Sequence, residues 1–298
     1  MTASSLRTAH APQAYLIARN FGAQVLSWRP QDADEVLWVS PLASLHTPSP
    51  IRGGIPICLP WFGQPARSAA IDTQQAPSHG FARNLEWETV QGTGEETLRY
   101  RLTHTPSASG QLEATTRGKT SAEHWALYPH SFEAELSLRA QQTLELSLTV
   151  TNTDDHSFVF ENAFHTYFRV SDVRSVHLEG LAGEPFFDGL VGFTPGICEP
   201  RMIFIGPTDR VVTCNAPVTL HDPGFSRTIR IETQGFGSRI VWTPWEEGTR
   251  SMADIPNEEW TNFLCVEAGN AFGTERRIEA GQTLEMVMKV SVESFPGA

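Results

Sequence analysis

Long hydrophobic runs are missing from this sequence. No segment approaches the ~18–20 consecutive apolar residues that a membrane-spanning helix needs, and no apolar stretch follows a basic start at the N-terminus, as a secretory signal would require. We therefore expect a soluble, cytoplasmic protein that does not act at a membrane.

Cysteine is also scarce. The 298 residues include only Cys58, Cys198, Cys214 and Cys265, which lie far apart and form no C-x-x-C pair. This spacing argues against a disulfide framework and against a cysteine-based zinc site, and it fits reduced thiols in the cytoplasm.

Positive charge is in short supply, with 22 Lys and Arg residues against 34 Asp and Glu residues. Nucleic-acid affinity comes largely from neutralised phosphates, so the net charge of −12 argues against such a partner. An anionic small substrate would be repelled at long range and would need local arginines to hold it. The G-x-S-x-G, H-E-x-x-H, P-loop and G-x-G-x-x-G motifs are missing as well, which removes support for a serine hydrolase, a zinc protease or a nucleotide-binding protein.

What the sequence does contain is period-two alternation. Leu144 to Val150 reads LELSLTV, which places four apolar side chains on one face of a strand. The same pattern recurs in residues 97–102, 132–138, 228–232, 239–243 and 283–292. Because no long helical period separates these segments, we predict an all-β protein, a large antiparallel β-sandwich. Short helical turns are expected only around 246–253 and 257–261. We expect one domain over residues 1–298, and a monomer.

The segment Arg52–Gly63 reads RGGIPICLPWFG and departs most from an ordinary strand. Its adjacent glycines permit close backbone approaches that side chains forbid, and Pro56 and Pro60 each remove a backbone donor. We predict a rigid, irregular loop. Arg52 opens this loop and the block HGFAR (His79–Arg83) follows shortly after, so together they can present polar groups to a small ligand. A structural turn with solvated arginines is the alternative.

Two further residues suit acid–base chemistry. His165 lies in ENAFHTYF, where aromatic cover can move an imidazole pKa to a value useful for proton donation. A core histidine is the alternative. Glu267 lies in FLCVEAGN, whose apolar residues predict a buried strand. Burial would raise the pKa of its carboxyl and improve it as a general base near pH 7. The alternative is a strand-end glutamate that faces water.

Other residues are weaker candidates for contact with a sugar. Asp209 lies in FIGPTDR, which we expect to be a turn, where its carboxylate either accepts a sugar hydroxyl or plays an ordinary turn role. Trp61, Trp242 and Trp245 offer flat apolar surfaces on which sugar rings stack, although tryptophans in such positions more often belong to the core.

Taken in order, the blocks RGGIPICLPWFG, HGFAR, NAFHTYF, VWTPW and CVEAGN resemble the hexose-6-phosphate mutarotases (glucose-6-phosphate 1-epimerases). These belong to the aldose 1-epimerase, or galactose mutarotase-like, superfamily. The resemblance covers the chain from about Leu26 to Val292. It implies a β-supersandwich with a cleft across one concave face. It also implies that His165 is the catalytic acid and Glu267 the catalytic base of anomer interconversion, with neither a metal nor a cofactor.

The same resemblance implies how a hexose 6-phosphate would be held. Arg52 and Arg83 would bind the phosphate, Asp209 would bind a sugar hydroxyl, and His79 would share the ligand with Arg83. Ser78 stands where the family often has Gln, so its shorter side chain loses a substrate hydrogen bond or passes it to water.

A second departure concerns the segment around Asp209. Relatives usually have Glu two residues earlier, where this chain has Pro207, and an aromatic residue shortly after, where this chain has Val211 and Val212. Asp209 is therefore the least secure part of the predicted site.

Three other functions compete with this interpretation. The first is an aldose 1-epimerase that acts on unphosphorylated sugars such as galactose, against which RGGIP and HGFAR argue. The second is a β-sandwich glycoside hydrolase with Asp209 and Glu267 as its carboxylate pair, which would demand separations of roughly 5–5.5 or 6.5–9.5 Å. The third is a sugar-phosphate-binding protein without catalysis, against which the presence of both His165 and Glu267 argues.

Overall fold

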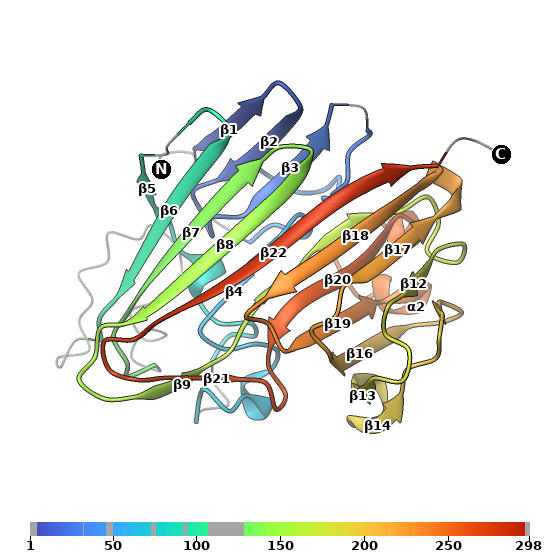
Figure 1. The fold of residues 1–298 in the computed structure, drawn as a ribbon. Helices are drawn as coiled ribbons and strands as arrows, with labels where there is room; N and C mark the ends of the chain where they lie inside the picture. The colour runs from blue at the N-terminus through green and yellow to red at the C-terminus, as the bar shows by residue number, and fades with distance from the viewer. Residues whose placement is uncertain are drawn as a thin grey trace.

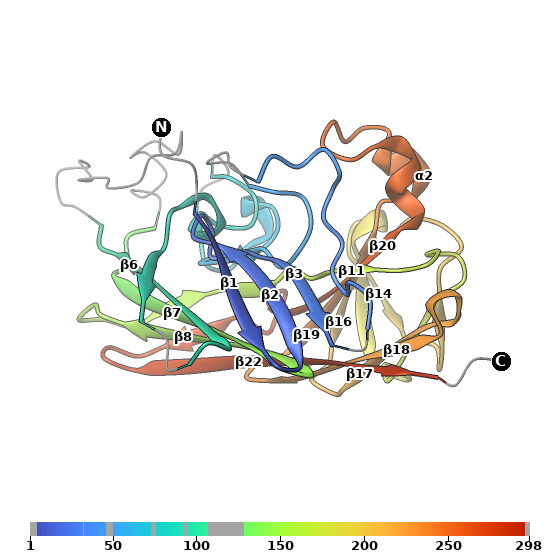
Figure 2. The same cartoon turned by 90° about the horizontal axis from the view of Figure 1, so that it is seen from above.

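The computed structural model describes residues 5–31, 33–45, 50–72, 76–91, 94–106 and 128–295. Two large sheets dominate these residues (Figure 1), and every strand pair within them is antiparallel. One sheet lies at the front of the molecule in Figure 1 and at the bottom in Figure 2, while α2 and several irregular segments lie on the opposite side. This is the all-β sandwich that the alternation predicted.

The front sheet has nine strands. In spatial order they are β15 (Met202–Ile203), β12 (His177–Glu179), β17 (Val218–Asp222), β18 (Arg227–Gln234), β22 (Thr283–Ser294), β8 (Thr143–Asn152), β7 (Phe132–Ala140), β6 (Thr97–His104) and β5 (Glu88–Val90). Buried residues alternate with half-buried ones along β8, as period two requires. Each leucine buried in this way stabilises the fold by about 1.5–3 kcal/mol.

The second sheet has eight strands. Its order is β14 (Thr194–Ile197), β13 (Pro185–Asp188), β16 (Thr208–Thr213), β19 (Ser238–Thr243), β20 (Phe263–Asn270), β10 (Asn162–Phe164) and β4 (Ile57–Cys58), with β11 (Tyr167–Arg169) pairing with β20 outside this path. Two smaller sheets consist of β1 (Leu6–Ala11), β2 (Ala14–Arg19) and β3 (Val25–Pro30), and of β9 (Phe158–Phe160) and β21 (Arg276–Ile278).

Both large sheets contribute to one continuous hydrophobic core. Leu146 of β8, Phe164 of β10 and Val241 of β19 are fully buried in the same cluster. That these layers form a single domain remains our prediction.

Helical structure in the described residues is short. It comprises α2 (Trp245–Thr249) and the 3₁₀ turns η1 (Pro65–Arg67), η2 (Ala82–Asn84), η3 (Gly189–Val191), η4 (Pro223–Phe225) and η5 (Asn257–Thr261). The two helical segments expected from the sequence correspond to α2 and η5. Of the helices described, none has the length and apolar character needed to cross a membrane.

The loop Arg52–Gly63 is mostly irregular, as expected, apart from the two residues of β4. Its glycines are required by close packing. Gly54 has φ +63°, and a Cβ at this position would lie 2.0 Å from the carbonyl oxygen of Val25. Only glycine fits so near another backbone with this conformation, so the loop is held tightly against β3.

Candidate active site

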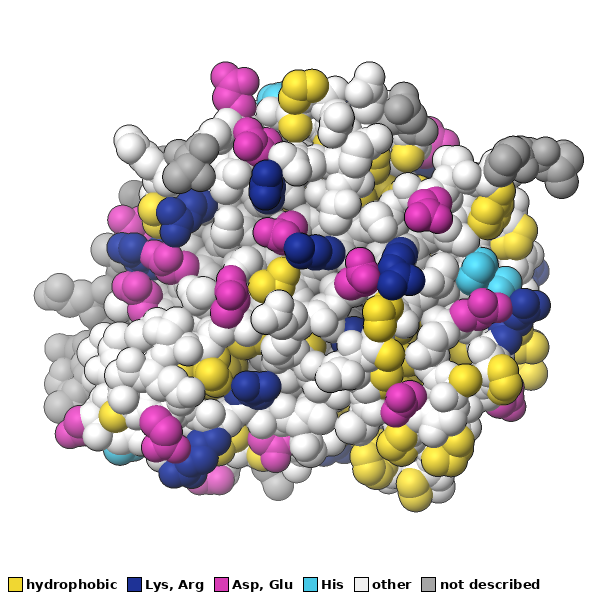
Figure 3. Space-filling view, viewed as in Figure 1, with side chains coloured by type: hydrophobic (Ala, Val, Ile, Leu, Met, Phe, Trp, Pro, Cys, Tyr) yellow, Lys and Arg dark blue, Asp and Glu magenta, His cyan; other side chains and the backbone are white. Residues whose placement is uncertain are grey.

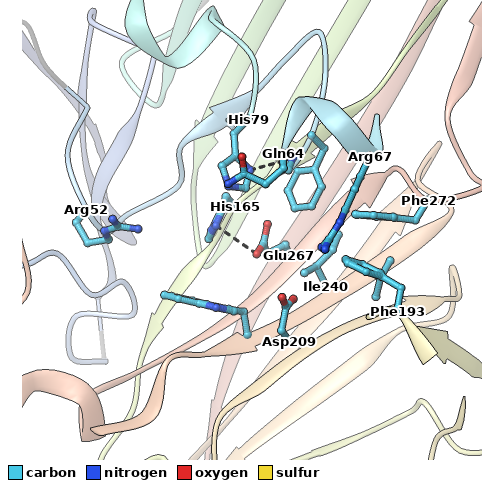
Figure 4. Close-up of a pocket in the computed structure, with 14 residues that line it drawn as sticks. Arg52, Gln64, Arg67, His79, His165, Phe193, Asp209, Ile240, Glu267 and Phe272 are labelled. Atoms are coloured by element: carbon cyan, nitrogen blue, oxygen red, sulfur yellow. Dashed lines mark hydrogen bonds and ion pairs between the residues drawn. The ribbon is translucent and has the colours of Figure 1, made fainter. Parts of the chain in front are cut away.

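A pocket opens beside the middle of the eight-stranded sheet (Figure 4). Its walls come from the Arg52–Gly63 loop, the HGFAR block and strands β16, β19 and β20. The lining residues are Arg52, Phe62, Gly63, Gln64, Arg67, His79, His165, Phe193, Asp209, Val211, Ile240, Trp242, Glu267 and Phe272. A cleft in which apolar side chains surround convergent polar groups is the usual form of a small-molecule site, and here charged or polar side chains make up half of the lining.

His165 and Glu267 meet in this pocket. Glu267 lies on β20, where Val266 and Ala268 turn into the sandwich core, so alternation directs the carboxylate to the opposite face. His165 follows β10, and its backbone N–H donates to the carbonyl of Pro56, which ties it to the RGGIP loop. The Nε2 atom of His165 lies 3.4 Å from Oε1 of Glu267. The two residues proposed for proton transfer therefore face each other.

Burial controls the protonation of this pair. Glu267 is 1% exposed and His165 is 8% exposed. Loss of hydration raises the pKa of the Glu267 carboxyl well above its ordinary value, and the nearby Asp209 carboxylate adds to this effect. Loss of hydration also lowers the pKa of His165 well below 6.5, assisted by the charges of His79, Arg83 and Arg52. Both residues are thus driven toward their neutral forms. The strand-end alternative for Glu267 is excluded by its burial.

His79 lines the pocket in a defined tautomer. Its Nδ1 accepts a hydrogen bond from the backbone N–H of Gly63 at 3.3 Å, which leaves the proton on Nε2. Burial, with the charges of Arg83 and Arg52, lowers its pKa to about 3. Its φ of +64° is unusual for a residue other than glycine. Its ring lies 5.4 Å from the ring of His165. His79 is therefore a neutral hydrogen-bond donor held in a strained backbone conformation.

Asp209 lines the pocket from a strand. The expectation that it lies in a turn was wrong, because the turn ends earlier and Asp209 is the second residue of β16, paired with Trp242 of β19. Burial raises the pKa of its carboxyl, and the charge of Asp188 adds to this while that of Arg67 opposes it. A Cβ on Gly189 would lie 2.3 Å from Oδ2 of Asp209. The glycine therefore makes room for this carboxylate.

The two predicted phosphate-binding arginines occupy different environments. Arg52 lines the pocket, and its Nε donates to Oδ2 of Asp254 at 2.9 Å. Arg83 and Ser78 are not among the described residues that line it. Instead, Arg83 donates from Nη2 to the carbonyl of Ser78 at 3.0 Å, directly before His79. Arg83 therefore holds the backbone next to His79 instead of lining the pocket.

Several lining residues were missed by sequence reasoning. Arg67 is the last residue of η1, and its guanidinium lies 4.4 Å from the ring centroid of Phe193. Phe193 in turn stacks on Phe272, with 4.8 Å between ring centroids. Figure 4 shows Arg67 across the pocket from Arg52. No motif marked these residues, because each lies in a short 3₁₀ turn or an irregular segment that has no hydrophobic periodicity.

The three tryptophans divide between pocket and core. Trp242 lines the pocket, with its ring centroid 6.3 Å from that of His165. Trp61 is fully buried and donates from Nε1 to the carbonyl of Pro77, so it belongs to the core. Trp245 packs on Trp260 at 4.8 Å instead of lining the pocket.

Comparisons with known proteins identify the family of this chain. A family model described as aldose 1-epimerase matches residues 8–291. Two curated relatives are both named "Putative glucose-6-phosphate 1-epimerase". The one from Salmonella typhimurium is 33% identical over 260 residues, covering 87% of this chain and 80% of the relative. The one from Cenchrus ciliaris is 32% identical over 255 residues, covering 83% of this chain and 72% of the relative.

A solved structure from Salmonella typhimurium, described as a "putative mutarotase (YeaD)", has the same fold. It aligns with a TM-score of 0.82 and 27% identity, over 98% of this chain and 94% of that one. The galactose mutarotase-like sandwich expected from the sequence is confirmed. With the family model spanning nearly all of its length, and with a histidine and a glutamate facing each other in its pocket, this chain belongs to the aldose 1-epimerase family.

Proposed function

We propose that this protein is a glucose-6-phosphate 1-epimerase, which interconverts the α and β anomers of a hexose 6-phosphate with His165 and Glu267 as its acid and base. The observation that carries the proposal is the 3.4 Å approach of these two buried groups in a pocket that Arg52 also lines. The names of the curated relatives support glucose 6-phosphate as the substrate.

Anomer exchange needs two coordinated proton transfers. Glu267 removes the proton of the anomeric hydroxyl while His165 protonates the ring oxygen, and the bond between C1 and the ring oxygen breaks. Rotation about C1–C2 presents the other face of the aldehyde. Ring closure then reverses both transfers, so no proton, electron or water is consumed. Each transfer of this kind is typically worth about 10²–10⁴ in rate.

One shared proton suffices for the pair. Before ring opening the pair carries one proton, on His165. After ring opening it again carries one, on Glu267, because His165 has given its proton to the ring oxygen and Glu267 has taken the proton of the anomeric hydroxyl. The neutral pair that burial favours corresponds to the open-chain complex. In the free enzyme, transfer of the proton from Glu267 to His165 across the 3.4 Å between them converts the neutral pair into the state needed for ring opening, without exchange with solvent. Oε2 of Glu267, which is buried without a hydrogen-bond partner among the described residues, is free to accept a substrate hydroxyl.

The remaining polar groups position the sugar. His79 donates from Nε2 to a sugar oxygen, and Asp209 accepts a sugar hydroxyl. Arg52 binds the phosphate, for which a guanidinium is well suited because its bonds are charge-assisted and can be bidentate. Arg83 holds the Ser78–His79 turn from behind.

The catalytic assignment is tested by exchange NMR on α- and β-glucose 6-phosphate. We expect His165→Asn and Glu267→Gln each to lower the catalysed exchange rate by about 10²–10⁴. His10→Asn and Glu247→Gln make the same chemical changes at exposed positions and should keep the wild-type rate. Folding is checked by circular dichroism. Wild-type exchange in either pocket variant would exclude the assigned role.

The phosphate assignment needs a separate comparison, because Arg52 and Arg67 lie on opposite sides of the pocket. We expect Arg52→Ala to lower kcat/KM for glucose 6-phosphate far more than for glucose, and Arg67→Ala to affect both sugars alike. The opposite pattern would move the phosphate to Arg67. Equal losses on both sugars with Arg52→Ala would make that arginine structural.

A further inference from the structure

Three potential metal ligands gather on the nine-stranded sheet, away from the pocket. His177 and Glu179 are two residues apart on β12, so their side chains point to the same face. His221 on β17 is the direct cross-strand partner of His177. Between them, Leu178 and Leu220 turn into the core, which leaves the three polar side chains on the outer face. Figure 3 shows histidine, acidic and basic side chains together at the right of this face.

The ligand atoms converge on one small volume. Nε2 of His177 lies 3.5 Å from Oε1 of Glu179, and Nε2 of His221 lies 3.4 Å from Oε2. The imidazole rings are parallel, with 4.5 Å between centroids and 4° between planes. One ligand atom from each residue can be chosen so that all lie within 4.8 Å of one another. Cross-strand pairing therefore places two imidazoles beside a single carboxylate. An imidazole nitrogen binds a metal in the plane of its ring, so one of the two stacked rings must rotate about its Cβ–Cγ bond for both nitrogens to reach the same ion.

These separations suit a tetrahedral ion. Zn²⁺ binds histidine nitrogen at about 2.0–2.1 Å and carboxylate oxygen at about 2.0–2.2 Å, so two ligands of one tetrahedral ion lie roughly 3.3–3.5 Å apart. Each histidine nitrogen lies at this separation from a different oxygen of Glu179, so the carboxylate is within ligand spacing of both imidazoles. Two imidazoles and a carboxylate are a donor set that zinc and neighbouring transition metals accept. Three protein ligands leave the fourth position to water.

A neighbouring arginine orients the carboxylate. Arg201 donates from Nε and Nη2 to Oε1 of Glu179, at 3.1 and 3.0 Å. Outer-shell hydrogen bonds of this kind hold a metal ligand in place.

We propose that His177, Glu179 and His221 form a binding site for a divalent late transition-metal ion, with Zn²⁺ as its probe. The sequence argument against zinc rested on cysteine spacing and does not bear on these ligands, which come from two strands brought together by sheet register. The bound ion links β12 to β17 near an edge of the sheet. The ion thus adds a cross-link outside the candidate active site. The proposal of this metal site does not depend on the proposed catalytic activity.

The test is a calorimetric titration of the full, tag-free, chelator-treated protein with Zn²⁺, together with the thermal midpoint with and without the ion. Wild-type protein should bind Zn²⁺ and gain thermal stability. His177→Asn and His221→Asn should each weaken binding by more than about tenfold, since changing even an outer-shell partner costs about 10–100-fold. Both variants should lose the thermal gain. Circular dichroism serves as the check that they are folded.

A second histidine cluster provides the matched control. His130 and His156 lie with ring nitrogens 3.1 Å apart beside Asp154, but Nδ1 of His156 is bonded to Asp155. His156→Asn should leave Zn²⁺ affinity and the thermal gain at wild-type values. Unchanged binding in both His177→Asn and His221→Asn would overturn the proposal. So would loss of binding in His156→Asn alone, because the ion would then occupy the other cluster.

Discussion

Replacing Glu267 with glutamine should change how the stability of this protein depends on pH. In the unfolded chain the carboxyl loses its proton above its ordinary pKa of 4.5, whereas in the native protein burial raises that pKa well above this value. Between the two pKa values the native state binds more protons than the unfolded state. The free energy of unfolding therefore falls as pH rises, by about 1.4 kcal/mol per pH unit for one group.

Glu267→Gln removes this contribution, so its stability relative to wild type should increase with pH. Urea unfolding followed by tryptophan fluorescence at pH 5, 6 and 7 measures the difference in the free energy of unfolding, which should grow with pH by at most about 1.4 kcal/mol per unit.

The control is Glu247→Gln, at an exposed position of α2, for which the difference should not change with pH. A constant difference between wild type and Glu267→Gln would show that Glu267 is ionised in the native protein. The neutral pair assigned to the free enzyme would then be wrong.

Two further outcomes follow from particular contacts. Gly189→Ala should push the Asp209 carboxylate away, and loss of its bond to a sugar hydroxyl should lower kcat/KM by about 10–100-fold. Gly206→Ala, where a Cβ meets no described atom within 4 Å, should leave the kinetics unchanged, and equal effects in both would refute a role for Asp209. His104 is fully buried with a pKa lowered to about 4, so the unfolded state binds the extra proton below pH 6.5 and stability falls on acidification. Urea unfolding should show wild type losing about 3 kcal/mol more than His104→Gln between pH 6.5 and 4, and parallel losses would contradict this.

Local pattern alone determined the class of fold. The sequence shows the alternation of apolar and polar residues directly, because a strand with one buried face places an apolar side chain at every second position. This pattern predicted β6, β7, β8, β18, β19 and β22. The apolar residues around Glu267 likewise indicated its burial, which the structure confirms. The Arg52–Gly63 loop was recognised because its glycines and prolines restrict the backbone wherever they occur.

Only the tertiary structure decided which side chains meet. The position of Asp209 depends on β16 pairing between β13 and β19, and a turn signal nearby does not reveal that pairing. The packing of short and irregular segments decides that Arg67 lines the pocket, whereas Arg83 bonds to the backbone of Ser78. The approach of His177 to His221 depends on the register of β12 against β17. Such contacts join segments distant in the chain, and their energies come from packing and pairing that no local periodicity records.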